Sequence, residues 1–370
     1  MARAYGFRVF VLEAFPNKIK DVDPYNASQG SPVMEEIAQL LSRLEEKGTH
    51  RFQPTTDETG RPTKPIATAT IYDPVIIQPN LIHARIAIGE EGSHISATKP
   101  DEEARSLEGW SPEAAHEVTF IFPNEMGSEF LLVTQTNHRR DPRSRLTSML
   151  KNESMVLREE RIANDRLVRE QAKEEGRTVP KKKTFKRLVF TCRQASDNEY
   201  LDELLAKADK ASVVFKSKKM DAVGNTTYVD RVLQIKLRNE NISEIAGRAS
   251  KKWVKSWRAG ETITPKEAVL ELGDLLEEHD LIVSGEEQQY ESAAISLQGK
   301  TDNATTTIAA DTMRDAFTYP LSDLPPTKEV YCSRAFDRVH SIARQENIEI
   351  ELADPIEVAA CLTESVLAVS

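Results

Sequence analysis

The sequence contains few of the residues that mark a secreted or membrane-spanning protein. Three cysteines, Cys192, Cys332 and Cys361, are spread over 370 residues, and this odd, sparse set does not fit a disulfide framework. None of them has the C-x-x-C spacing of a redox or zinc site. No apolar run approaches the about 20 residues that cross a bilayer, and the first residues are typical of a strand instead of a signal peptide. We therefore expect a cytoplasmic protein without a membrane span.

Catalytic signatures are equally scarce. The seven histidines show no H-E-x-x-H pair and no other spacing of metal ligands, and G-x-S-x-G is absent. The segment from Ala294 to Thr301 resembles a phosphate-binding loop that lacks its first glycine. The residues that follow it favour a strand, so a hairpin turn at Gly299 is the simpler interpretation. The sequence favours a protein without enzymatic activity, metal or cofactor.

One enzymatic alternative remains open. Asp221 or Asp230, together with Gln234 and Lys236, are the residue types with which some metal-dependent nucleases hold Mg²⁺ and stabilise developing charge. The same residues are also typical of solvent-facing positions on a basic hairpin. A metal-dependent nuclease is therefore the alternative to a protein with no catalytic centre.

Charge is distributed unevenly along this acidic chain. The net charge is −10, yet residues 177–258 contain 20 Lys and Arg against 9 Asp and Glu, a net charge of +11. Residues 259–370 contain 7 basic and 22 acidic residues, a net charge of −15. Clustered cations repel one another unless a partner neutralises them. A basic block inside an acidic protein therefore indicates a polyanion site.

The hydrophobic pattern predicts an α+β protein with two domains. Alternating apolar residues predict a β-rich first domain over residues 1–136, and an imperfect apolar repeat among charged residues predicts a long connecting helix within 137–178. A second, mixed α+β domain is expected over 179–370, with a basic first half (179–258) and an acidic C-terminal part (259–370). Its strands and helices do not alternate regularly, so no βαβ repetition is expected.

Within these domains, several elements are clear from the pattern alone. Helices are predicted over Met34–Glu46 and Asn198–Lys207, where apolar residues recur at helical spacing. The segments His116–Phe122 and Glu129–Gln135 predict a hairpin. A strand is predicted near the end of the chain, over Ile348–Leu352.

Three elements carry the candidate phosphate contacts. The first is a lysine-rich run where a strand is predicted to begin, which can follow a phosphate backbone. The second is a predicted helix over Asn241–Trp257, whose apolar face lies beside a stripe of five cations with no acid among them. The third is the junction between a strand and the long helix, where the helix dipole also favours an anion. In chain order, the candidate nucleic-acid-binding residues are Arg139, Arg140, Arg143, Arg145, Lys181, Lys182, Lys183, Lys186, Arg187, Arg248, Lys251, Lys252, Lys255 and Arg258.

Each of these elements has a simpler interpretation. The lysine run can be a solvated linker, and the junction can be a charged turn in which Arg139 pairs with Asp141. Acids from residues 259–370 can cover the cationic stripe. If they do, the acidic part could shield the basic surface as an internal polyanion that DNA must displace.

Together the three elements predict on the order of 6–10 phosphate contacts, and therefore a strongly salt-dependent affinity. No zinc-finger spacing, RNP-like aromatic motif or helix-turn-helix pattern predicts the readout of bases. We expect a sequence-tolerant DNA-binding protein, with double-stranded DNA favoured as the partner. A protein-assembly subunit that docks an acidic partner through the same basic region is a further alternative.

The order of elements also resembles a known family. A strand over Phe130–Gln135 runs into Thr136-Asn137-His138-Arg139-Arg140, followed by the charged helix and the basic α+β domain. This order resembles the RexA-type phage-exclusion proteins and related antiphage proteins. The resemblance is one of architecture over about residues 1–260, and it assigns no individual functional residue. It implies a homodimeric, DNA-binding component of a phage exclusion or defence system.

Overall fold

A computed structural model gives the fold of the chain. It describes residues 5–17, 23–54, 56, 58–59, 63–77, 80–91, 96–97, 105–106, 113–138, 140–220, 227–238, 241–283, 285–299 and 305–367. The chain is α+β with antiparallel sheets, as the sequence predicts. Within these ranges, no helix combines the length and the apolar character needed to cross a membrane.

The chain forms two compact units that divide it differently from the predicted domains. The first unit contains Tyr5–Gln194 and Leu324–Ser370, and the second contains Ala195–Asp323. The predicted boundaries at residues 136 and 179 do not separate the units. The strand β9 (Leu188–Gln194) pairs with the first strand of the chain, so the whole connecting segment belongs to the first unit.

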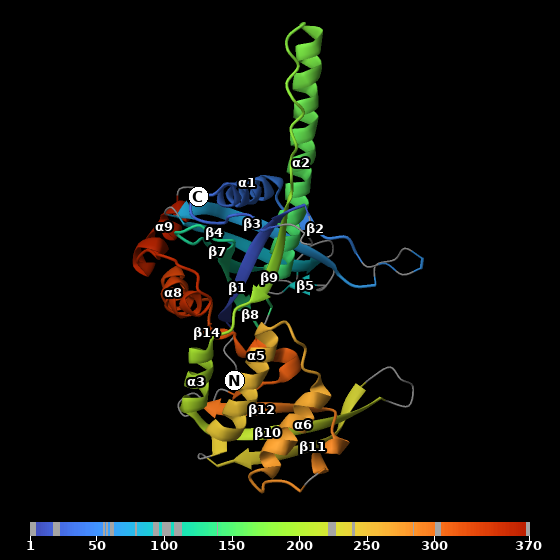
Figure 1. Ribbon diagram of the computed structural model, residues 1–370, viewed down its shortest axis with the longest axis vertical. Coiled ribbons are helices and arrows are strands. Elements are labelled where there is room, and N and C mark those ends of the chain that lie inside the picture. The colour runs from blue at the N-terminus through green and yellow to red at the C-terminus, as the bar shows by residue number, and fades with distance from the viewer. Residues whose placement is uncertain are drawn as a thin grey trace. The chain divides into compact units, whose positions relative to one another are not determined.

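The first unit is built on an antiparallel sheet (Figure 1). Its strands follow the order β1, β8, β7, β4, β3, β2, and β9 also pairs with β1. Their bounds are β1 Tyr5–Pro16, β2 His50–Arg51, β3 Ile66–Ile77, β4 Leu81–Glu91, β7 Glu113–Ile121 and β8 Glu129–Asn137. The predicted hairpin is confirmed as β7 and β8, which pair in antiparallel register with Thr119 opposite Val133.

One face of this sheet carries the main hydrophobic core. Alternate residues of β1, such as Phe10 and Leu12, pack in one cluster with Ile37 and Leu41 of α1 (Pro32–Lys47) and Leu150 of α2 (Arg143–Glu174). The helix α1 begins where Ser31 Oγ accepts a hydrogen bond from the Met34 amide and a proline follows, which is a good helix start. The burial of this apolar stripe fixes α1 and the first half of α2 against the sheet.

The C-terminal segment lies against the same sheet. The helix α8 (Lys328–Gln345) places the Tyr331 hydroxyl 3.3 Å from Thr119 Oγ1, on the face opposite the main core, and α9 (Pro355–Leu367) packs against α8. The strand predicted over Ile348–Leu352 is wrong. This stretch pairs with none of the described strands, and its backbone carbonyls instead accept bonds from the Asn124 amide and the Asn80 side chain.

The second unit has its own four-stranded antiparallel sheet. Its order is β11 (Thr227–Leu237), β10 (Ala208–Met220), β12 (Ser292–Gly299) and β13 (Thr305–Ile308). This unit also contains the helices α3 (Asn198–Lys207), α5 (Arg248–Arg258), α6 (Pro265–Glu277) and α7 (Met313–Ala316), and a π-helical turn, Ile242–Gly247, leads into α5. Residues 294–299 lie within β12, so they form no phosphate-binding loop.

Candidate nucleic-acid interface

The helix α2 continues far beyond the core that holds it. It has 32 residues, about 48 Å at 1.5 Å per residue. Its first half buries Leu146, Leu150 and Leu157, whereas Ala172 is its one buried residue after Arg158. We call residues 158–187 the arm, because the helix extends away from the sheet and the chain returns beside it (Figure 1). The far end of the arm is therefore held by its own two segments.

The chain reverses direction at Gly176. Its φ of +66° lies in the left-handed region, which glycine adopts without the steric cost that a side chain brings. The Gly176 amide donates to the Lys173 carbonyl, and the Arg177 amide donates to the Ala172 carbonyl at 2.8 Å. This cap ends the helix and directs the next residues back along it.

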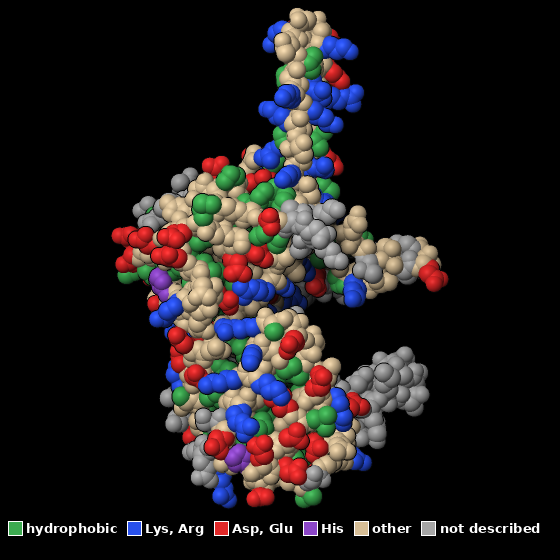
Figure 2. All heavy atoms as spheres, viewed as in Figure 1, with side chains coloured by type: hydrophobic (Ala, Val, Ile, Leu, Met, Phe, Trp, Pro, Cys, Tyr) green, Lys and Arg blue, Asp and Glu red, His purple; other side chains and the backbone are tan. Residues whose placement is uncertain are grey.

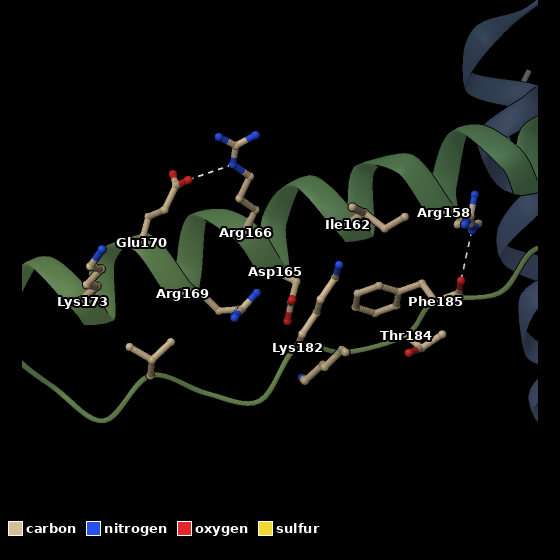
Figure 3. A pocket seen from close by; sticks show the side chains of 12 residues that line it. Arg158, Ile162, Asp165, Arg166, Arg169, Glu170, Lys173, Lys182, Thr184 and Phe185 are labelled. Carbon is tan, nitrogen blue, oxygen red and sulfur yellow. Dashed lines mark hydrogen bonds and ion pairs between the residues drawn. The ribbon is translucent and has the colours of Figure 1, made fainter.

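A groove lies between the helix and the returning segment (Figure 3). It has a volume of about 670 Å³. Six of its lining residues are cationic and two are acidic; the complete lining is Arg158, Ile162, Asp165, Arg166, Arg169, Glu170, Lys173, Val179, Lys182, Lys183, Thr184 and Phe185. Lys and Arg side chains are also prominent over the whole arm in the space-filling view (Figure 2).

Two arginines fasten the returning segment to the helix. Arg158 Nε donates to the Phe185 carbonyl at 3.0 Å, and Arg169 Nε donates to the Pro180 carbonyl at 3.3 Å. A carbonyl oxygen satisfies a guanidinium donor but leaves its positive charge uncancelled. These contacts therefore hold the groove together without reducing its net charge.

The lysines of the arm are exposed and have no acidic partner among the residues that the structure describes. Within the described ranges, no hydrogen bond or ion pair involves the side chains of Lys173, Lys181, Lys182, Lys183 and Lys186. Two acids of the arm are already engaged, since Glu170 pairs with Arg166 at 2.8 Å and Glu175 pairs with Arg177. Arg187, the last cation predicted in this run, differs from the lysines because its guanidinium donates hydrogen bonds to the Asn17 carbonyl.

The helical half of this groove is not among the residues that the sequence predicts as a site. Its cations, Arg158, Arg166, Arg169 and Lys173, lie in the predicted connecting helix. The available signal was their spacing of three, four and eight residues, which places them along one side of a helix. Only the reversal at Gly176 shows that this side faces the lysine run.

The predicted junction site is largely structural. Arg145 donates to the carbonyls of Thr68 and Gly89 at 3.0 and 2.7 Å, and burial lowers the pKa of its guanidinium although it stays charged. Arg143 lies 4.9 Å above the Phe10 ring. Arg140 is exposed, and Arg139 lies outside the described residues. The acid of this turn, Asp141, pairs with Arg8 at 3.7 Å.

The cationic stripe of α5 meets acids of its own unit. Arg248 pairs with Glu278 at 2.8 Å, Lys251 with Asp202 at 2.8 Å, and Lys252 with Glu271 at 3.2 Å. Arg258 donates to the Ser196 carbonyl at 3.0 Å, and Lys255 has no partner within the described ranges. Much of the stripe is therefore neutralised by neighbouring side chains.

These acids do not form a detachable shield. The helix α6 carries Glu271 and buries Val269, Leu272 and Leu276 in the second unit. Residues beyond Asp323 belong to the first unit. Removing residues 259–370 would therefore take core elements from both units, so charge substitutions are the cleaner test of shielding.

Two of the four residues of the nuclease alternative lie wholly or partly outside the described residues. Asp221 lies outside the described residues, as does the side chain of Asp230, whose backbone forms the bulge of β11 between Val229 and Arg231. Lys236 is exposed, and Gln234 donates to Ser212 Oγ at 2.9 Å. Of the residues that the structure describes, no group of three or more His, Cys, Asp and Glu could hold a metal ion.

Comparison with known proteins returned no match to a family model, a curated protein or a solved structure.

Proposed function

We propose that this chain is a sequence-tolerant DNA-binding protein that grips backbone phosphates with its arm. The observation that supports the proposal is the set of five exposed arm lysines that form no ion pair with a described residue, beside a groove lined by six cations and two acids. Such a set repels itself until a polyanion neutralises it. Lysine and arginine contacts to phosphate carry no base information, so the binding is tolerant of sequence.

The biological setting and the assembly follow from the resemblance to the RexA-type proteins. We propose phage exclusion or defence as the setting and a homodimer as the assembly. Plating a phage panel on cells that contain the wild-type protein or an arm variant tests the setting. Equal plaque counts in both strains and in cells without the protein would argue against it.

The binding proposal is tested by fluorescence anisotropy with a labelled oligonucleotide between about 50 and 200 mM salt. The arm variant is Lys181→Gln/Lys182→Gln/Lys183→Gln. The matched control is Lys251→Gln/Lys252→Gln/Lys255→Gln, which removes the same charge from α5. We expect the arm variant to reduce the slope of log affinity against log salt by about 2–3, since each lysine on a phosphate contributes about one. The control reduces it by about one or less.

Equal losses in the two variants would assign the binding to overall charge instead of the arm. Heparin binding without any nucleic-acid binding would point to an acidic protein partner and reject the proposal.

A further inference from the structure

The floor of the arm groove is apolar and aromatic, which phosphate contacts alone do not require. Phe185 extends from the returning segment towards α2, in the space between Ile162 and Lys182 (Figure 3). Ile162 and Val179 also line the groove, with 40% and 42% of their surface exposed. The Phe185 carbonyl accepts the bond from Arg158, so this segment is fixed where the ring enters the groove. The groove therefore offers a flat apolar face surrounded by cations.

This combination discriminates between forms of nucleic acid. A duplex keeps its bases stacked inside and presents phosphates outside, so it can use only the cations at the rim. A single strand offers an unpaired base next to its phosphates, and aromatic side chains in a basic groove are the common means of binding it without sequence preference. The volume of about 670 Å³ lies within the range of about 300–1,000 Å³ that buries small organic molecules.

We propose that the groove binds single-stranded nucleic acid, with an unpaired base against Phe185 and flanking phosphates at Lys182, Lys183 and Arg169. This inference rests on the proposed function and names the form of its ligand, whereas the sequence alone favours double-stranded DNA. Of the two acids in the groove, Glu170 is engaged by Arg166. Asp165 lies between Arg169 and Lys182 (Figure 3) and can accept from an N–H group of a base.

The test compares a labelled oligothymidine with a duplex of equal length at one salt concentration. The variant Phe185→Leu keeps an apolar side chain and removes the ring. Leu167→Ala is the control, because Leu167 lies on the helical half of the arm but does not line the groove. We expect Phe185→Leu to weaken single-strand binding roughly 5- to 150-fold, the range of base–aromatic stacking, and to leave duplex binding and circular dichroism unchanged. Leu167→Ala leaves both affinities unchanged.

Two further measurements leave the chain unaltered. A wild-type complex with an oligonucleotide containing 5-iodouracil is irradiated, and we expect a cross-linked peptide that contains Phe185. Thymidine monophosphate, used as a competitor, is expected to displace the oligonucleotide poorly because it lacks the flanking phosphates. Equal competition by the mononucleotide would overturn the assignment of a polymer, and cross-links only to other peptides would overturn the role of Phe185.

The outcomes distinguish a failure of the single-strand inference from a failure of the proposed DNA-binding function. If Phe185→Leu affects neither form, or both equally, while the arm lysines still govern salt-dependent binding, the single-strand inference fails and the proposed function stands. If neither form shows salt-dependent binding, the proposed function itself fails.

Discussion

The lysine run of the arm and the cationic stripe of α5 are similar in sequence and differ in the folded protein. Each presents several cations with no acid inside its own pattern. In the structure, Arg248, Lys251 and Lys252 face acids from α3 and from the region of α6. Lys181, Lys182 and Lys183 are exposed and form no ion pair in the part of the chain that is described. The two segments have a similar density of cations in the sequence, but the α5 stripe is largely paired with acids in the folded protein, whereas the lysine run is not.

The difference follows from how each element is supported. The helix α5 belongs to a compact unit, where Trp253 is fully buried and acids of α3 and of the α6 region lie within ion-pair distance of its cations. The arm extends beyond the sheet. After Arg161, which pairs with Glu36 of α1 at 3.6 Å, the described ion pairs of the arm join its own residues. A cationic segment therefore retains its net positive charge where it protrudes, and is partly neutralised where it packs against elements that carry acids.

The largest expected effect concerns the buried side of α5. Trp253→Ala should lower the free energy of unfolding of the second unit by about 3–5 kcal/mol, because it opens a cavity in the core. Leu167→Ala, on the exposed helix of the arm, should stay within about 0.5 kcal/mol. Urea denaturation followed by circular dichroism measures both. Similar costs for the two variants would contradict the contrast between a packed element and a protruding one.

The next effect concerns the base of the arm. Glu153, 5% exposed, accepts from Arg43 at 2.7 Å and from Lys47 at 2.5 Å. Burial raises the pKa of this carboxyl, but the bonds from Lys47 and Arg43 outweigh it, and the net pKa is lowered from 4.5. Glu153→Gln should cost about 1.5–3 kcal/mol at neutral pH.

The pH dependence has a defined sign. A lowered pKa in the folded state stabilises the protein above the unfolded value near 4.5, and this stability is lost as the pH falls through the folded pKa. Urea midpoints of the wild type and of Glu153→Gln should therefore converge in acid. The control, Glu278→Gln, removes an exposed partner and should change stability by less than about 1 kcal/mol. A gap between wild type and Glu153→Gln that persists in acid would contradict the role of the carboxylate charge.

The smallest effect is expected when the α5 stripe loses its acidic partners and so becomes more like the arm. Asp202→Asn/Glu271→Gln/Glu278→Gln removes the acids that face the α5 stripe, and we expect oligonucleotide affinity to rise about two- to fivefold as the cations are released. The matched control is Glu329→Gln/Asp337→Asn/Glu357→Gln, three exposed acids of α8 and α9. A gain that is equal in both triple variants would show a general charge effect and no contribution of α5.

Sequence patterns predict individual helices and strands better than they predict which residues these elements contact. The helix over Asn198–Lys207 and the antiparallel pair of β7 and β8 follow from apolar periodicity and turn residues. The strand predicted over Ile348–Leu352 does not form, because this stretch has the apolar content of a strand but pairs with no strand that the structure describes. The residues Arg143 and Arg145 could not be separated from true anion contacts, because their partners are a ring and carbonyls that are distant in sequence.

The sequence by itself determined the α+β class, the long charged helix and the concentration of cations in the middle of the chain. These depend on periodicity and composition, which are local properties. Only the tertiary structure decided which cations keep their charge unopposed and which aromatic ring lies among them. Electrostatic neutralisation acts over a few ångströms of space, and the spatial neighbours of Lys182 or Lys252 are set by the reversal at Gly176 and by the packing of α6, not by the residues next to them in the chain.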